Sequence, residues 1–446
     1  MPDILSYVLK NFFAVYKIKP MNIDIGYGTD EVGKIWIKRN DNHYFEYHEV
    51  LNLRNIIWKE WKKVKIPFLF DNKNTGDIIS MNKGNIIINY DIVASSFYLL
   101  TNWQEYISQS KDDYGRFSYS DSLQYQLQIS EIPVVNYYFD ILRDAIETGY
   151  NINLIQDLWE KKSFSVCLTH DIDLCESAWI QGSYREFIKG RIFSPIKLIT
   201  KKIITNDDWF NFDKIIEIER YYKVNSTFMF LANSESKNGI PNADYNISHP
   251  KYRKTLVLIL KNKSEVAIHG SIGTHKNTDL LKSEIERTSA NIKGNRFHFL
   301  LYDVYSTPEV LTQSGLKYDS TLYFAETCGF RNSYCFPFYL YDIKNNLTTD
   351  IIEIPLTVMD VTFEKKYLNI SQEEALQKMI NLANEIEKFG GCFTLLWHNT
   401  SFSDYKYKGW KEIYCKFLEF AIDKDALLTS GENIYELFTT GNSIND

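Results

Sequence analysis

The chain has 446 residues, with 50 Lys and Arg against 57 Asp and Glu, a net charge of -7 and 44% hydrophobic residues. This length and hydrophobic content allow two packed domains, one of about 150 residues and one of about 250 to 300. The acidic balance and the lack of a long basic block argue against non-specific binding of nucleic acid, which needs a concentrated Lys and Arg face.

The sequence contains no feature typical of export or membrane insertion. The N-terminal residues lack a charged region followed by a continuous apolar stretch and a small-residue cleavage site. No apolar run approaches the roughly 18 to 20 residues that a bilayer-spanning helix requires. The six cysteines include no CxxC pair, so we expect free, buried thiols. Together these features predict a cytoplasmic protein without a transmembrane segment.

Residues 1–155 are predicted to form a smaller α+β domain, whose role the sequence leaves open. Short segments of β-forming residues predict strands at 34–38, 44–50 and 84–90. Apolar residues at helical spacing predict helices at 91–108 and 134–148.

Between residues 160 and 440, short apolar strands alternate with longer amphipathic segments, which is the pattern of βα repetition. Seven strands are expected, at 164–168, 226–231, 265–268, 296–300, 320–323, 351–355 and 392–397. Helices are expected at 209–222, 280–293, 372–389 and 410–422. The third of these helices has the clearest signature, because Ser371 and Glu374 form a capping box before its apolar stripe. We therefore predict an α/β fold, a distorted (β/α) barrel of about seven strands.

The segment 163–175, with the sequence SFSVCLTHDIDLC, places two carboxylates at the end of a buried strand. In an extended chain, Asp171 and Asp173 point to the same side and His170 points to the opposite side. Two carboxylates at such close range are costly unless a cation or a shared proton relieves their repulsion. A metal ion is the simplest relief.

Three other predicted strands also end in histidine. His269 follows one strand, His298 lies in the next, and His398 follows the last. Because a barrel brings the carboxyl ends of its strands to one face, we expect these histidines and the carboxylates to share a site. An Asp with two His suits Zn, and also Co, Mn, Ni or Fe(II), and fits Ca or Mg poorly. With a second Asp as general base and a His as general acid, such a site would perform metal-assisted hydrolysis.

Residues 163 to about 400 resemble the polysaccharide deacetylase family, also called the NodB homology or carbohydrate esterase 4 group. The matching segments are THDID at 169–173, EVAIHGSIGTH at 265–275, GNRFHFL at 294–300, YDSTLYFAETCGFRNSYCFPF at 318–338 and LLWHN at 395–399. The whole chain also resembles a bacterial subgroup in which an N-terminal domain of little-studied function precedes the deacetylase-like domain. That resemblance is carried by DIVASSFYLLTNWQEY at 91–106 and DDYGRFSYSDS at 112–122.

The resemblance implies roles for individual residues. The catalytic base falls on Asp171 and the metal-binding carboxylate on Asp173. The first metal-binding histidine falls on His269 and the general acid on His398. Arg331 resembles the arginine that orients the base.

Three aromatic residues resemble the walls of the family's sugar pocket, where flat rings cover the apolar faces of sugars: Trp397, Phe330 and Tyr323. Packing in the core is an equally good interpretation of these side chains.

Two departures from the family pattern leave alternatives open. The family has a second histidine four residues after the first, where this sequence has Gly273. We expect His298 as the third metal ligand, with His275 as the alternative. One residue separates the two aspartates, which are adjacent in the family, so either Asp171 or Asp173 could bind the metal.

The function that we expect is a metal-dependent hydrolase, with zinc as the first choice of metal. It would remove acetyl groups from an N- or O-acetylated sugar of a polysaccharide or a lipid-linked glycan precursor. The alternative from another class is a catalytically inactive glycan-binding or scaffold protein that retains the fold. A phosphohydrolase of the HD type, suggested by His170 and Asp171, is disfavoured because that class places its pair on helices.

Overall fold

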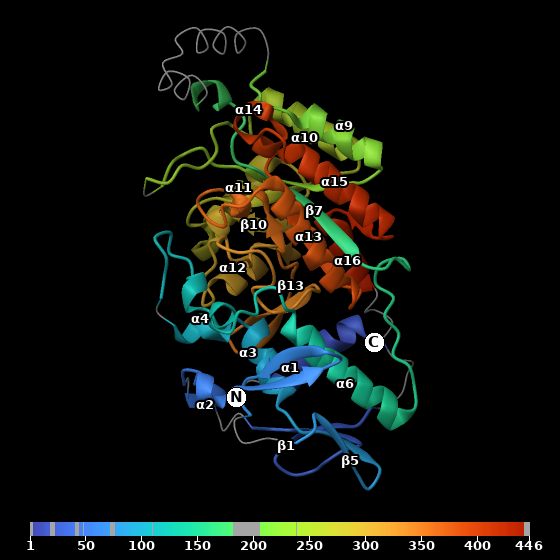
Figure 1. Ribbon diagram of the computed structural model, residues 1–446. Coiled ribbons are helices and arrows are strands. Elements are labelled where there is room, and N and C mark those ends of the chain that lie inside the picture. Colours follow the sequence, from blue (N-terminus) through green and yellow to red (C-terminus); the bar gives the residue numbers. More distant parts are fainter. Residues whose placement is uncertain are drawn as a thin grey trace.

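The chain folds into a smaller N-terminal unit, residues 3–155, and a larger unit, residues 163–440, which lie one above the other in Figure 1. The computed structural model describes residues 3–17, 23–40, 44–47, 49–71, 76–108, 110–181, 206–237 and 239–440. Buried apolar side chains of both units belong to one continuous core. Among the described residues, none of the helices combines the length and the apolar character that crossing a bilayer requires.

The N-terminal unit combines two small sheets with six α-helices among its described residues. Its strands are β1 (Ile25–Gly28), β2 (Ile35–Lys38), β5 (Ile79–Asn82) and β6 (Asn85–Ile88) in one sheet, and β3 (Ile57–Trp61) and β4 (Val64–Phe68) in a hairpin. Its helices are α1 (Ile4–Val15), α2 (Tyr44–Tyr47), α3 (Ile92–Leu100), α4 (Trp103–Ile107), α5 (Leu123–Gln126) and α6 (Val134–Tyr150). The strand predicted at 44–50 is wrong, because this segment begins as the short helix α2. The helix predicted at 91–108 is divided at Asn102, which has a left-handed φ of 56°.

The larger unit is built around one sheet, with ten strands in the described residues instead of the seven expected. The strands are β7 (Ser165–Ile172), β8 (Thr227–Leu231), β9 (Glu265–Gly270), β10 (Gly294–Phe297), β11 (Tyr318–Asp319), β12 (Phe338–Asp342), β13 (Leu347–Glu353), β14 (Val358–Met359), β15 (Cys392–Leu396) and β16 (Leu427–Thr429). Their order is β12-β13-β11-β10-β9-β8-β7-β15-β14, and β16 pairs with β7. Only β12 is antiparallel to its neighbour; the other pairs are parallel.

The central strands of this sheet are buried throughout. Every residue of β7, β8, β9 and β15 is buried, because helices cover the sheet, and this explains why these strands read as continuous apolar runs. The helices are α9 (Phe212–Tyr222), α10 (Pro250–Lys261), α11 (Thr278–Thr288), α12 (Thr307–Gln313), α13 (Gln372–Glu387), α14 (Asp404–Tyr407), α15 (Trp410–Asp423) and α16 (Gly431–Thr440). The capping box predicted for Ser371 and Glu374 is present at the start of α13. The strand predicted at 320–323 is wrong, because β11 ends at Asp319. The sequence also did not predict β12, β14, β16, α10, α12, α14 or α16.

The two units meet at the segment 329–333, which is hydrogen-bonded to the N-terminal unit. The Arg331 Nη2 atom lies 2.7 Å from the Glu105 carboxylate, and both side chains are buried. The Asn332 amide donates to the carbonyl oxygens of Leu99 and Leu100 and to the Asn102 side chain. This interface therefore contains a buried charge pair that neither unit would satisfy alone.

Replacing Arg331 with Ala should lower the free energy of unfolding by about 3–5 kcal/mol, because Glu105 would remain buried without its counter-charge. Urea unfolding of the full chain, followed by tryptophan fluorescence, measures the loss. The double variant Glu105→Gln/Arg331→Met should recover most of it, since no unpaired charge remains. The control Lys344→Ala removes an exposed ion pair with Glu309 and should cost less than about 1 kcal/mol. A similarly small loss in Arg331→Ala would contradict this account of the interface.

Candidate metal centre and active site

Strand β7 carries the two carboxylates of the central motif. The strand extends beyond its predicted end, so that Asp171 lies within it and Asp173 lies just after it. His170 points to the opposite face, where its Nδ1 donates to the carbonyl oxygen of Trp397 at 2.7 Å and its Nε2 lies 2.9 Å from Glu219. The alternation expected from an extended chain is therefore present, and His170 does not share a site with Asp171.

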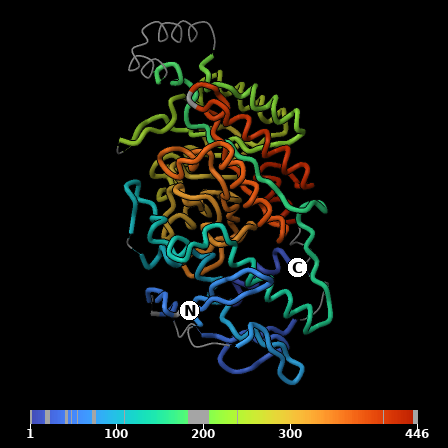
Figure 2. Tube along the Cα trace, in the orientation of Figure 1, coloured from blue at the N-terminus to red at the C-terminus, as the bar shows by residue number. Residues whose placement is uncertain are grey.

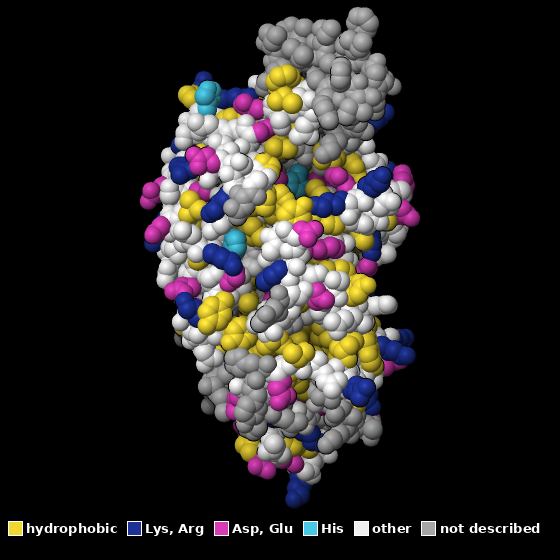
Figure 3. Space-filling view, turned by 90° about the vertical axis from the view of Figure 1, so that its left-hand side faces the viewer, with side chains coloured by type: hydrophobic (Ala, Val, Ile, Leu, Met, Phe, Trp, Pro, Cys, Tyr) yellow, Lys and Arg dark blue, Asp and Glu magenta, His cyan; other side chains and the backbone are white. Residues whose placement is uncertain are grey.

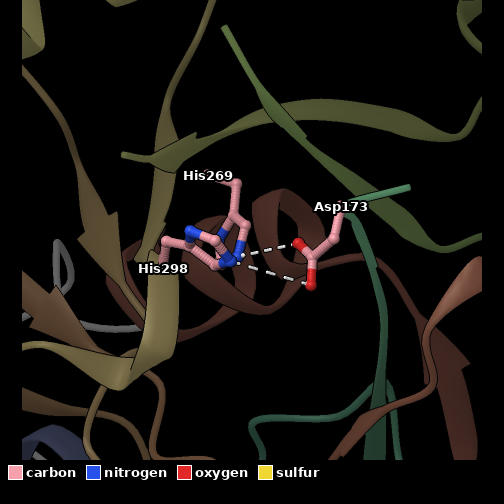
Figure 4. Close-up of side chains that lie close together, drawn as sticks. All are labelled: Asp173, His269 and His298. Carbon is pink, nitrogen blue, oxygen red and sulfur yellow. Dashed lines mark ion pairs between the residues drawn. The ribbon is translucent and has the colours of Figure 1, made fainter. Parts of the chain in front are cut away.

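Asp173 lies against two imidazoles from neighbouring strand ends. The His269 Nε2 atom lies 3.3 Å from Asp173 Oδ1, and the His298 Nε2 atom lies 3.9 Å from Asp173 Oδ2. Figure 4 shows both rings directed at the carboxylate. One ligand atom from each of the three side chains lies within 4.8 Å of the others, which is close enough for a single metal ion.

The Nδ1 atom of each ring is hydrogen-bonded to a neighbouring residue, so that Nε2 is the nitrogen that faces the site. The His269 Nδ1 atom donates to the backbone carbonyl of Arg296 at 2.7 Å, and the His298 Nδ1 atom lies 3.3 Å from the Asn242 side-chain oxygen. That oxygen also accepts a hydrogen bond from the backbone N–H of Ile272, so it is an acceptor and His298 must be the donor. With Nδ1–H on both rings, each Nε2 faces Asp173, and it offers a lone pair to a cation once its own proton is lost.

These three residues fit a divalent transition-metal ion. Asp173 Oδ1 is buried and has no hydrogen-bond partner among the described residues. Burial raises the pKa of Asp173, but the imidazoles of His298, His269 and His398 outweigh burial and hold this pKa below its usual value. An ionised carboxylate thus faces two ring nitrogens, and a metal ion that displaces their protons would be a partner for all three. The mixed nitrogen and oxygen set suits zinc and its neighbours better than calcium or magnesium.

Asp171 is bound by Arg296, which lies in β10 directly opposite His269 in the parallel register. The fully buried Arg296 donates from Nη1 to Asp171 Oδ1 at 2.8 Å and to Thr169 Oγ1 at 2.9 Å. The sequence assigned this orienting role to Arg331, whose guanidinium instead pairs with Glu105 at the interface between the units. The arginine that binds Asp171 lies in the segment GNRFHFL, and the sequence pattern alone did not show that its side chain is buried against this carboxylate.

His398 follows β15 and is bound by a carboxylate that sequence reasoning missed. Asp360, the residue after β14, accepts from His398 Nδ1 at 2.7 Å and from the His398 backbone N–H at 2.9 Å. Burial lowers the pKa of His398, but Asp360 outweighs burial and raises this pKa to about 10. The protonated ring directs its Nε2 toward Asp173 Oδ2, 3.7 Å away. Because β14 has only two residues, the sequence contains no strand signal that would have drawn attention to Asp360.

The carboxyl ends of the strands surround a cavity of 180 Å³. Its polar wall consists of Asp171, Asp173, His269, His298 and His398. Its apolar wall consists of Leu300, Ala325, Met359, Val361 and Leu396, and the remaining lining residues are Arg116, Phe299, Lys366 and Tyr367. On the face shown in Figure 3, a histidine side chain is visible among hydrophobic side chains in the upper half of the molecule.

None of the three aromatic residues that the sequence assigned to a sugar pocket is among the described residues lining the cavity. Trp397 is fully buried in the core, Tyr323 is 1% exposed, and Phe330 lies at the interface between the units. Core packing was the correct interpretation for these side chains. The aromatic carbon rings at the cavity belong to Phe299, in the short 3-10 segment His298–Leu300, and to Tyr367, in a turn, and neither segment carries a periodic signal.

His298, not His275, completes the group around Asp173. His275 lies in a short 3-10 helix, and its ring packs 6.1 Å from that of Phe297. Gly273, at the position of the missing family histidine, has a φ of 94°, and a Cβ atom there would meet the side chain of Lys237. The second imidazole therefore comes from the neighbouring strand instead of the same loop.

The turn after His298 is strained. Phe299 and Leu300 have φ values of 59° and 57°, in the left-handed region that bulky side chains rarely adopt. Each such residue costs about 1–2 kcal/mol. Surrounding contacts must therefore hold this turn, which connects His298 to the apolar wall of the cavity.

Comparison with known proteins gives a family match for the N-terminal unit. Residues 5–151 match the model of a family of unknown function, DUF7033. No curated protein matches the chain.

Several solved structures align with the chain at low identity. A protein named as a candidate polysaccharide deacetylase from Mycobacterium smegmatis is 16% identical, with a TM-score of 0.42, over 63% of this chain and 92% of the other. The allantoinase Puue is 11% identical, with a TM-score of 0.40, over 63% and 91%. A candidate polysaccharide deacetylase from Pseudomonas aeruginosa is 10% identical, with a TM-score of 0.41, over 66% and 96%. Similarity at this level says nothing of the chemistry, which has to be argued from the site itself.

The protein should bind one zinc ion, and His298→Ala should weaken binding by more than about 100-fold. This loss should exceed the 10–100-fold typical of an outer hydrogen-bonding partner, because a ligand itself is removed. Isothermal titration with zinc measures the affinity. The matched control is His275→Ala, which removes a nearby imidazole outside the group and should change the affinity by less than about twofold. Unchanged binding in His298→Ala would refute the assignment of this residue.

Proposed function

We propose that the protein is a metal-dependent hydrolase that removes acetyl groups from an N- or O-acetylated sugar of a polysaccharide or glycan precursor. One observation carries the proposal: a single cavity combines a base held by an arginine, Asp171, a protonated acid, His398, and a cation site at Asp173. Metal-assisted hydrolysis of an amide or ester uses these three elements together. The motif resemblance described above supports an acetylated sugar as the substrate.

A zinc ion held by Asp173, His269 and His298 would polarise the acyl carbonyl and lower the pKa of a bound water towards neutrality. Three protein ligands leave coordination positions open for water and substrate. Cobalt, manganese, nickel or iron would suit the same ligands.

Asp171 is the proposed general base. Arg296 binds its Oδ1 and so holds the carboxylate in one orientation. The other oxygen, Oδ2, lies 3.6 Å from His269 Nε2 and therefore faces the proposed cation site. From this position Oδ2 accepts a proton from the attacking water.

His398 is the proposed general acid. Asp360 accepts the Nδ1 hydrogen, so the proton available for transfer is on Nε2 at the cavity. Nε2 donates this proton to the departing amine or alkoxide. Asp171 and Asp360 thus take different roles. Arg296 orients Asp171 as the base, and Asp360 binds the acid, His398.

The apolar wall of the cavity supports an acetyl group as the part of the substrate that enters. Leu300, Ala325, Met359 and Leu396 lie on that wall, next to the polar groups. A methyl group gains free energy by leaving water for such a surface, whereas a charged acyl group would lose it.

Asp171→Asn should retain zinc and reduce acetate release from acetylated chito-oligosaccharides by about 10²–10⁴-fold, because the base is lost while the ligands remain. His269→Ala should lose both zinc and activity. Acetate is assayed enzymatically and zinc by elemental analysis on the same samples. Tight sugar binding by the wild-type protein without zinc or acetate release would instead support the inactive glycan-binding alternative.

The dependence of kcat/KM on pH should reflect the Asp360–His398 pair. A general acid must carry its proton, so kcat/KM falls as the pH rises through the pKa of His398, which Asp360 raises. Asp360→Asn removes the anion and lowers that pKa, so the alkaline limb should move to lower pH by about one to three units. Ser401→Ala, which removes only a hydroxyl that donates to Asp360, is the matched control and should shift the limb much less. An alkaline limb that stays in place in Asp360→Asn would exclude His398 as the acid.

A further inference from the structure

The 112–117 loop of the N-terminal unit reaches the cavity of the larger unit. Arg116 lines the cavity, and its side chain is 8% exposed. In Figure 2 the segment that follows α4 rises beside the larger unit. The N-terminal unit therefore supplies part of the wall around the candidate metal site.

The loop is held in one shape by its own hydrogen bonds. The Asp112 backbone N–H donates to the Arg116 carbonyl at 2.8 Å, and the Gly115 N–H donates to the Asp112 carbonyl at 2.9 Å. The Asp112 side chain accepts from the backbone N–H groups of Tyr114 and Arg116. Gly115 has a φ of 85°, which suits glycine. Such a loop presents its side chains without first having to be ordered by the larger unit.

Two side chains of this loop contact the same residue, Phe299. The Tyr114 ring stacks on the Phe299 ring, with 5.1 Å between the centroids and 26° between the planes. The Arg116 Nη1 atom donates to the Phe299 carbonyl at 3.4 Å. Asp112 holds the guanidinium in place through Nε at 2.7 Å and Nη2 at 2.6 Å. The loop therefore contacts both the side chain and the backbone of Phe299.

Phe299 directly follows His298, and it is the first residue of the strained turn. Its ring lies 4.5 Å from the His298 ring. A phenylalanine prefers right-handed or extended conformations, and a return to either would rotate the adjoining peptide and turn His298 away from Asp173. The contacts from Tyr114 and Arg116 oppose that rotation.

We propose that the 112–117 loop is a positioning element of the metal centre. Tyr114 and Arg116 keep Phe299 in its left-handed conformation and thereby hold His298 against Asp173. The proposal rests on the metal site of the proposed function, but not on the removal of acetyl groups. It gives the N-terminal unit, which matches a family of unknown function, a part in the chemistry of the larger unit.

Zinc titration of the full chain tests the proposal. Tyr114→Ala and Arg116→Ala should each weaken zinc binding about tenfold, at the lower end of the range for outer partners of a metal ligand. Tyr114→Phe keeps the stacked ring and should bind zinc as the wild type does. Tyr125→Ala is the matched control, because Tyr125 is a 52% exposed aromatic residue of the same unit, and it should also bind normally.

A second measurement distinguishes the backbone strain at Phe299 from a general loss of packing around the metal site. Asn adopts the left-handed conformation more readily than Phe does. In a Phe299→Asn background, Arg116→Ala should therefore lose most of its effect on zinc affinity. The substitution removes the same Arg116 contacts as it does in the wild-type chain. Thermal unfolding of each variant confirms that folded chains are being compared.

The outcomes distinguish this proposal from the proposed function. Unchanged zinc affinity in both Tyr114→Ala and Arg116→Ala would overturn the positioning role and leave the hydrolase proposal standing. A tenfold loss in these variants, in a protein that never releases acetate, would support the positioning role and remove the deacetylase proposal.

Discussion

The structure depends on how three carboxylates are neutralised, two that line one small cavity and a third that binds its histidine wall. Asp171 and Asp360 are 2% and 3% exposed, and the Oδ1 atom of Asp173 is buried, so unpaired charges on these groups would be costly. Each carboxylate has a different partner. Arg296 pairs with Asp171, His398 pairs with Asp360, and the two imidazoles at Asp173 leave room for a cation. In the proposed mechanism, these three chemically identical groups serve as a base, the support of an acid and a metal ligand.

The sheet makes this arrangement because its strands are parallel and end together. Asp171, His269 and Arg296 lie in adjacent or nearby strands, and His298 and His398 follow strands β10 and β15. The carboxyl ends of parallel strands are where such folds gather polar side chains over a buried apolar base. The buried Glu105–Arg331 pair then fixes the N-terminal unit against this edge. That attachment is what allows the 112–117 loop to reach the turn at Phe299.

Residues next to long apolar strands were predictable from the sequence, and residues in irregular segments were not. Asp171, Asp173, His269, His298 and His398 follow or lie in readable strands, so their convergence could be expected. Asp360 follows a strand of two residues, and Arg116 belongs to a different unit, so no local pattern points to either. Arg331 and Arg296 both lie in segments that resemble family motifs, and only tertiary packing shows which one faces Asp171. Trp397 and Tyr323 carry no signal that separates core packing from sugar contact.

X-ray absorption spectroscopy of the zinc-loaded protein tests the central claim most directly, because it reports the donor atoms around the ion. The arrangement predicts two imidazole nitrogens and otherwise oxygen donors, at about 2.0–2.2 Å from zinc. A sulfur donor at about 2.3 Å, or a spectrum without imidazole scattering, would show that zinc binds elsewhere and would contradict the account.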